Sequence, residues 1–98
     1  MKKIAFNNTE LDVSELCLGT SNFGTARSTE ESFEQMDVFL EAGGNFIDTA
    51  LVYGDWAWDE PGRSESVIGQ WLAKGGKREQ VIISTKGCHP PIDRKSVV

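Results

Sequence analysis

The first residues form two short segments in which a large apolar side chain recurs at every second position, Lys3–Phe6 and Leu11–Val13. Alternation with a period of two is typical of a β-strand that buries one face. Asn7 and Asn8 lie between the segments, and asparagine tolerates left-handed backbone angles better than most residues. We therefore predict a β-hairpin over residues 3–13.

Three later segments, Glu15–Leu18, Asn45–Asp48 and Val81–Thr85, are short and each contains a run of apolar residues. Continuous apolar runs of this length are typical of strands that are buried on both faces, as in a parallel sheet. We predict that each run is a strand and that the three are neighbours.

The segment between the first two runs has the pattern of an amphipathic helix that begins at Ser28 and ends at Ala42. Ser28 and Glu31 have the spacing of a capping box. Gly43 and Gly44 follow and can supply a left-handed C-terminal cap. The apolar residues that recur at helical spacing are expected in the core: Phe33, Met36 and Leu40.

A second helix is predicted from Ser64, as its N-cap, to about Lys74, with Gly75 and Gly76 ending it. Gly69 inside this helix costs about 1 kcal/mol relative to alanine, and we attribute it to close contact with a strand. The apolar face of this helix consists of four residues: Val67, Ile68, Trp71 and Leu72.

The predicted order is hairpin, β, α, β, α, β, which is typical of an α/β fold with a parallel sheet and right-handed crossovers. Pattern alone fits either a doubly wound sheet or the first third of a barrel. The loop 49–62 is long, and long loops in compact domains are often functional. Its Trp56 and Trp58 fit either a substrate cleft or ordinary loop packing. The tail 88–98 shows no clear element.

The composition indicates one small globular domain: 98 residues, 39% apolar and 26% charged. A net charge of −5 argues against non-specific binding to nucleic acid. No apolar run approaches the roughly 20 residues that span a bilayer, and no signal peptide is indicated, so we expect a cytoplasmic protein. Cys17 and Cys88 are then reduced thiols. Cys88 and His89 alone do not make a metal site.

Three polar residues lie at the ends of predicted strands or in the loop that follows, where active-site side chains are commonly placed. Asp48 ends the second predicted strand, Tyr53 lies in the following loop, and Lys86 ends the third strand. If the strands are parallel neighbours, the carboxyl ends meet at one edge, and the three side chains converge there. A carboxylate, a phenol and an ammonium in one place suit proton transfer.

Four motifs, in this order, resemble the N-terminal part of the aldo-keto reductase family. They are Gly19–Thr20 with Phe23–Gly24, Asn45–Ala50 with Tyr53–Gly54, Gly62–Glu65 with Ile68–Gly69, and Ile83–Lys86. Each is weak alone, but together they cover nearly the whole chain at compatible spacing.

The resemblance implies a (β/α)8 barrel, the TIM barrel, with an N-terminal hairpin that closes its bottom. It implies reduction of an aldehyde or ketone, a small-molecule carbonyl substrate, to an alcohol with NADPH. Within this sequence it implies that Tyr53 is the general acid, Lys86 the cation beside it, and Asp48 the ionic partner of Lys86. It also places Gly19 and Thr20, with Asp48 nearby, next to the nicotinamide end of the cofactor.

The chemistry explains these residue types. Carbonyl reduction moves a hydride to carbon and a proton to oxygen. A phenol with a pKa of about 10 is a poor acid at neutral pH unless a nearby ammonium stabilises its phenolate. A carboxylate keeps that ammonium charged and in position. The ammonium and the phenol also stabilise the alkoxide that develops on the substrate.

One expected residue is missing, because the family's fourth catalytic residue is a histidine after the fourth strand. The only histidine, His89, follows the third predicted strand, so we do not assign it this role. A barrel needs about 200 residues or more. We therefore expect residues 1–98 to be one partial domain, truncated relative to a longer reductase. The alternatives are a non-catalytic nucleotide-binding or regulatory subunit of the same fold, and an inert fragment.

Overall fold

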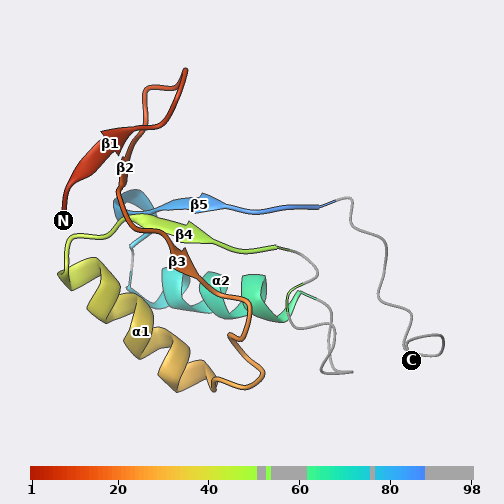
Figure 1. Cartoon of the computed structure of the whole chain (residues 1–98). Helices are drawn as coiled ribbons and strands as arrows, with labels where there is room; N and C mark the ends of the chain where they lie inside the picture. The colour runs from red at the N-terminus through yellow and green to blue at the C-terminus, as the bar shows by residue number, and fades with distance from the viewer. Residues whose placement is uncertain (51–52, 54–61, 76, 88–98) are drawn as a thin grey trace.

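The structure is a computed structural model that describes residues 1–50, 53, 62–75 and 77–87 (Figure 1). Along these residues the elements follow in the order β1 (Lys3–Ala5), β2 (Asp12–Ser14), β3 (Leu18–Gly19), α1 (Thr29–Glu41), β4 (Phe46–Asp48), α2 (Arg63–Gly75), the 3-10 helix η2 (Arg78–Gln80) and β5 (Ile82–Ser84).

Strands β3, β4 and β5 form one parallel sheet in that order, and β1 pairs with β2 in an antiparallel hairpin. In the parallel sheet Gly19 lies opposite Asp48, which in turn lies opposite Ser84. The last residues of the three strands therefore share one row at the carboxyl edge. This confirms the predicted hairpin and the predicted set of neighbouring parallel strands.

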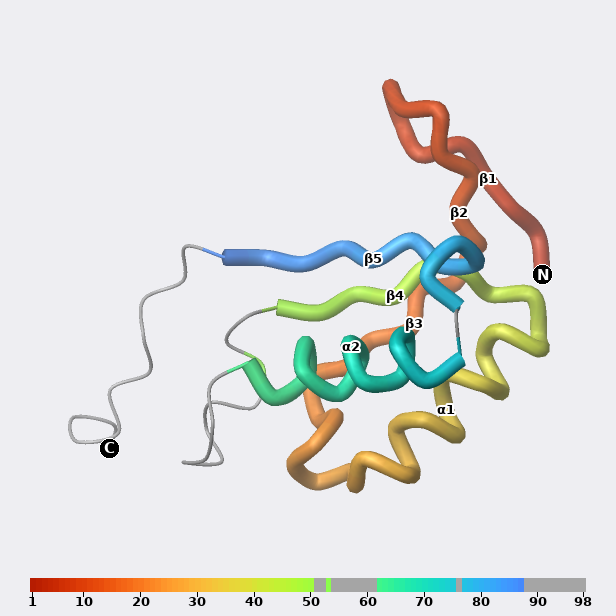
Figure 2. The backbone as a smooth tube through the Cα atoms, turned by 180° about the vertical axis from the view of Figure 1, so that it is seen from behind, coloured from red at the N-terminus to blue at the C-terminus, as the bar shows by residue number. Residues whose placement is uncertain are grey.

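Both helices lie on the same side of the parallel sheet, as the two opposite views show (Figures 1 and 2). Alternation along each strand turns one set of apolar side chains toward the helices. The described core lies between these two layers and contains predicted Met36 of α1 and predicted Val67, Ile68 and Trp71 of α2, together with Phe23, Ile47 and Val81. The other three predicted residues, Phe33, Leu40 and Leu72, are only partly buried and pack against this core.

The hairpin is attached to the amino end of β4, away from the row of strand ends. Asn45 carries most of this attachment: its Oδ1 accepts from the Ser14 N–H at 2.7 Å, and its Nδ2 donates to the Asp12 carbonyl at 2.9 Å. Lys3 Nζ donates to the Gly43 carbonyl at 2.6 Å. The hairpin turn uses Asn7 at φ +45°, as predicted.

Helix α1 has the predicted ends. The capping box between Ser28 and Glu31 is complete in both directions. At the other end, the Gly43 N–H donates to the Leu40 carbonyl and the next residue's N–H to the carbonyl of Phe39, at 3.0 and 2.9 Å. Gly43 has φ +92°, the left-handed angle that this Schellman motif requires.

The predicted start of the first parallel strand is wrong, because β3 begins at Leu18 and not at Glu15. The Glu15 N–H still donates to the Lys2 carbonyl, so this residue extends the hairpin pairing. Leu16 is 62% exposed, because the chain turns here between the hairpin and the sheet. An apolar run alone does not reveal such a turn.

Two predictions about α2 are also wrong. The helix begins at Arg63, so Ser64 lies in its first turn and is not its N-cap. Gly69 is exposed, and a Cβ placed on it would meet no atom of the described residues within 4 Å. Close contact with a strand therefore does not explain this glycine.

Some predictions fall outside the described residues. These concern Trp56 and Trp58 of the long loop, Cys88 and His89 of the tail, and Gly76. Among the residues that the structure describes, neither helix combines the length and the apolar character that crossing a membrane requires.

Candidate active site

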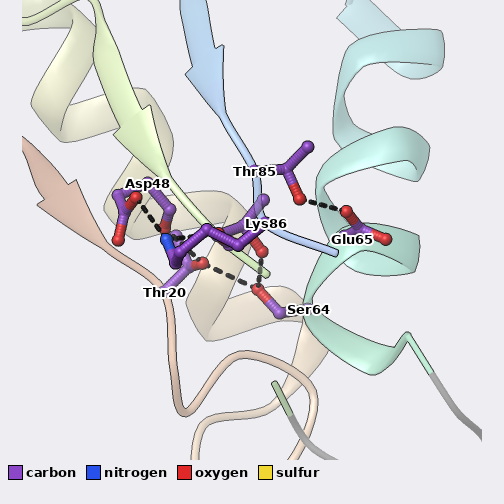
Figure 3. A network of polar contacts seen from close by, with 7 residues as sticks. Thr20, Asp48, Ser64, Glu65, Thr85 and Lys86 are labelled. Atoms are coloured by element: carbon purple, nitrogen blue, oxygen red, sulfur yellow. Dashed lines mark hydrogen bonds and ion pairs between the residues drawn. The ribbon is translucent and has the colours of Figure 1, made fainter. Parts of the chain in front are cut away.

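The carboxyl edge of the parallel sheet brings together residues that are far apart in the sequence (Figure 3). Asp48 ends β4, and Lys86 follows two residues after the end of β5. Gly19 ends β3 in the same row. Parallel pairing is the reason for this convergence, since all three strands point their carboxyl ends the same way.

Lys86 forms the centre of the polar cluster. Its Nζ donates to Asp48 Oδ1 at 2.7 Å and to the Thr49 carbonyl at 2.8 Å. The hydrogen bond from Lys86 to Asp48 raises the pKa of Lys86 above 10.5, so the ammonium is charged at neutral pH. The Lys86 and Asp48 side chains are 51% and 34% exposed, so this ion pair is open to solvent in the present chain.

Tyr53 lies beside the same ammonium. Lys86 Nζ is 5.4 Å from the centroid of the Tyr53 ring, within the range of a cation–π contact. A turn holds Tyr53 in place, because its N–H donates to the Ala50 carbonyl at 3.2 Å. The structure thus brings Asp48, Tyr53 and Lys86 together, as the sequence predicts.

The two residues expected near a cofactor differ in their surroundings. Gly19 is exposed, and no atom of the described residues lies within 4 Å of a Cβ placed there. Thr20 is fully buried, and its hydroxyl donates to the Asp48 carbonyl at 2.8 Å. Gly19 therefore leaves open space beside Asp48, whereas the Thr20 hydroxyl points inward and fixes the loop.

Two hydroxyls of this cluster were not identified from the sequence. Ser64 Oγ lies 2.7 Å from Thr20 Oγ1 and 2.8 Å from Thr49 Oγ1, and all three residues are at most 1% exposed. Figure 3 shows the Thr20 and Ser64 hydroxyls next to the Lys86–Asp48 pair. Ser64 is read as a cap because serine before an apolar helical pattern is a common cap signal. Only the tertiary contact distinguishes the two roles.

The first turn of α2 is also tied to the neighbouring loops. Glu65 accepts a hydrogen bond from the Thr85 hydroxyl, and Arg63 Nη2 donates to the Gly24 carbonyl. Both charged side chains therefore make structural contacts at the start of the helix. They fix the helix start against the loop that follows β3 and against the residue that follows β5.

Cys17 is a further ionisable group near the ion pair. Partial loss of hydration raises the pKa of the Cys17 thiol, the Asp48 carboxylate raises it further, and Lys86 lowers it. The thiol is therefore the neutral form at neutral pH. Within the described ranges, no three histidine, cysteine, aspartate or glutamate side chains are grouped so that they could hold a metal ion.

The cluster has the parts of a proton-donor site: a phenol, an ammonium beside its ring, and a carboxylate that holds the ammonium. Its place at the carboxyl edge of parallel strands with helices outside is that of the active sites of β/α barrels. The fold and the position of the cluster are those of the first strands of a β/α barrel.

The chain belongs to the Aldo/keto reductase family, whose model matches residues 15–97. It is 44% identical over 94 residues to the uncharacterized oxidoreductase YrpG of Bacillus subtilis, covering 95% of this chain and 28% of that protein. It is 39% identical over 84 residues to aryl-alcohol dehydrogenase [NADP(+)] of Phanerodontia chrysosporium, covering 78% of this chain and 20% of that protein.

Among solved structures, the chain resembles the holo form of aldo-keto reductase AKR11C1 from Bacillus halodurans. The TM-score is 0.73 at 34% identity, with 89% of this chain and 26% of that one covered. The chain thus spans 20% to 28% of the length of these relatives. It forms the first β/α units of a (β/α)8 barrel, preceded by the hairpin, which confirms the predicted family and fold.

Proposed function

We propose that this chain supplies the proton-donor part of the active site of an NADPH-dependent reductase of aldehydes or ketones. The observation that carries the proposal is the position of the Lys86 ammonium, 2.7 Å from Asp48 Oδ1 and 5.4 Å from the centroid of the Tyr53 ring. Family membership supports the reaction class. The rest of a barrel is needed to complete the site.

In this proposal the Tyr53 hydroxyl gives its proton to the carbonyl oxygen of the substrate while a hydride reaches the carbonyl carbon. Lys86 stabilises the phenolate that remains, because a positive charge beside the ring favours the anionic form. Asp48 keeps the ammonium oriented through its hydrogen bond. A positioned acid of this kind contributes about 10²- to 10⁴-fold to the rate.

The residues present fit the nicotinamide end of the cofactor, which supplies the hydride when it is bound. Gly19 leaves open space at the carboxyl edge, in the same row as Asp48. We propose that Gly19, the loop position of Thr20 and Asp48 form this side of the cofactor site. NADPH rather than NADH is proposed because the name of the Phanerodontia relative specifies NADP(+).

Aromatic aldehydes are the first substrate class to test, because the same relative is an aryl-alcohol dehydrogenase. The test uses the full-length protein, by which we mean this chain together with the rest of its barrel. It would be mixed with NADPH or NADH and with benzaldehyde or an aliphatic aldehyde, and cofactor oxidation would be followed by absorbance. We expect oxidation that depends on the aldehyde and is faster with NADPH. No aldehyde- or ketone-dependent oxidation of either cofactor would contradict the proposed function.

A further inference from the structure

Ser64 connects three segments that carry the proposed active site. It lies in the first turn of α2 and is fully buried. Its side chain contacts the hydroxyls of Thr20 and Thr49, and its backbone N–H donates to the Tyr53 carbonyl at 3.3 Å. The proposed mechanism uses none of these contacts of Ser64.

The direction of the hydroxyl chain follows from the number of protons available. Thr20 donates its only hydroxyl proton to the Asp48 carbonyl, so it can only accept from Ser64. Ser64 thereby uses its own proton and must accept from Thr49. The chain therefore runs from Thr49 through Ser64 and Thr20 to the Asp48 carbonyl, with every proton assigned.

The two ends of this chain are the residues that hold the ammonium. Lys86 Nζ donates to the Asp48 carboxylate and to the Thr49 carbonyl. The hydroxyl chain binds the Asp48 carbonyl at one end and starts from the Thr49 side chain at the other. Among the described residues, both acceptors of the Lys86 ammonium therefore belong to the dipeptide Asp48–Thr49, whose position Ser64 fixes.

We propose that Ser64 is a positioning residue that sets the placement of the Lys86 ammonium relative to the Tyr53 phenol. Its hydroxyl fixes the dipeptide that holds Lys86, and its N–H fixes the turn that holds Tyr53. Relative placement matters because misplacing reacting groups by about 1 Å can cost about 10²-fold in rate. This inference rests on the proposed function for its effect on catalysis.

Burial makes the Ser64 hydroxyl hard to replace. At zero exposure, no bulk water reaches the position to take over its two hydrogen bonds. Without the serine hydroxyl, the Thr49 donor loses its acceptor, and a buried donor without a partner drives local rearrangement. A rearrangement that gives the Thr49 hydroxyl a new acceptor shifts the Asp48–Thr49 dipeptide, which holds the Lys86 ammonium.

The test compares three variants of the full-length protein. Ser64→Ala removes the central hydroxyl, and Thr49→Val removes the neighbouring hydroxyl while keeping the side-chain volume. Ser66→Ala is the matched control, since Ser66 is an exposed serine two residues along the same helix. Circular dichroism and active-site titration first establish the folded fraction of each variant.

Two readouts are taken. One is kcat and KM for the aldehyde, and the other is the proton exchange rate of the Lys86 ammonium by ¹⁵N NMR, with its signal assigned by Lys86→Met. For Ser64→Ala and Thr49→Val we expect kcat per folded site to fall roughly 10- to 100-fold with little change in KM. We also expect Lys86 exchange to be several-fold faster, with both readouts unchanged in Ser66→Ala.

Wild-type kcat and wild-type Lys86 exchange in folded Ser64→Ala or Thr49→Val would overturn the proposal. A loss of folded fraction with normal exchange in the remainder would also overturn it, because Ser64 would then act only in stability. If Ser64→Ala does not fold, Thr49→Val decides. If the wild type reduces no carbonyl, the proposed function fails, and the exchange rates alone decide the role of Ser64.

Discussion

Lys86 and Asp48 are 38 residues apart in the sequence, yet Lys86 Nζ lies 2.7 Å from Asp48 Oδ1. Asp48 ends β4, and Lys86 follows the end of the neighbouring parallel strand β5. The sheet alone therefore assembles the ion pair, before any later part of a barrel is added. The pair holds a positive charge beside the Tyr53 ring.

Replacing Lys86 with methionine should lower kcat of the full-length protein by about 10²- to 10³-fold, the usual cost of removing one group that stabilises developing negative charge. Methionine keeps an unbranched stem of similar length and removes only the ammonium. Steady-state kinetics with an aldehyde and NADPH would measure the effect.

Lys77→Met is the control for this variant. Lys77 also forms an ion pair, with Asp37 of α1, but on the helix side of the sheet. The two variants lose the same charge and the same kind of contact. Equal losses of kcat in both would show that the effect of Lys86→Met is not specific to the site.

Gly43→Ala should lower the free energy of unfolding by about 1–2 kcal/mol, because an L-residue resists the left-handed angle. Gly43 has φ +92°, and a Cβ there would lie 2.9 Å from the Met1 backbone nitrogen. Urea unfolding of the full-length protein would measure the change.

Gly69→Ala is the matched variant, and it should change the free energy of unfolding in the opposite direction. Gly69 is inside α2, and a Cβ there meets no described atom within 4 Å. Alanine should raise the free energy of unfolding by about 0.5–1 kcal/mol, since it loses less backbone freedom on folding. A stabilised Gly43→Ala or a strongly destabilised Gly69→Ala would contradict this account of the two helix positions.

The stabilising effect of the contact between α1 and α2 at Asp37 should depend on pH. Hydrogen bonds from Lys77 and then from Trp71, whose Nε1 is 2.8 Å from Asp37 Oδ1, hold the pKa of Asp37 below its usual 3.8. A lowered carboxyl pKa in the folded state stabilises the fold above pH 3.8, and this stabilisation is lost as the pH falls through the folded-state pKa.

Asp37→Asn should therefore destabilise the protein at neutral pH by about 0.2–1 kcal/mol, the range for exposed ion pairs, and by progressively less below pH 3.8. Urea unfolding across this pH range tests it. Glu34→Gln, which removes an exposed carboxylate from the same helix, separates loss of the pair from loss of charge. A difference that stays constant with pH would exclude the ion pair as its cause.

The sequence predicts those parts of the fold that are set by contacts between residues close together in the chain. The helix ends at Ser28 and Gly43 are set by contacts within a few residues, so their pattern is sufficient. The neighbouring strands follow from the alternation of strands and helices. The strand start at Leu18 is missed, because the turn before it depends on contacts with the hairpin.

The same difference between local signals and long-range contacts applies to the candidate site. The convergence of Asp48, Tyr53 and Lys86 is predicted because they lie at or near strand ends and within motifs. The buried hydrogen bonds of Ser64 are missed because their partners are hydroxyls 44 and 15 residues away. A buried serine at a helix start and a capping serine look the same in sequence, and only packing separates them.

The 98-residue chain alone should show no measurable carbonyl reduction. The Lys86 side chain is 51% exposed here, and water around the ion pair weakens every electrostatic contribution to catalysis. Purified chain would be incubated with NADPH and an aldehyde, with chain bearing Tyr53→Phe as the control for contaminating reductases. Turnover by the wild-type chain that Tyr53→Phe abolishes would contradict this prediction.

Tyr53→Phe in the full-length protein tests the central claim most directly, because it removes the proposed acid and leaves the ring beside Lys86. We predict that kcat/KM for the aldehyde falls by at least about 10²-fold at every pH, while NADPH affinity changes little. The measurement is the pH profile of kcat/KM for wild type and variant. Near-wild-type activity of Tyr53→Phe across this profile would show that the proton comes from another group.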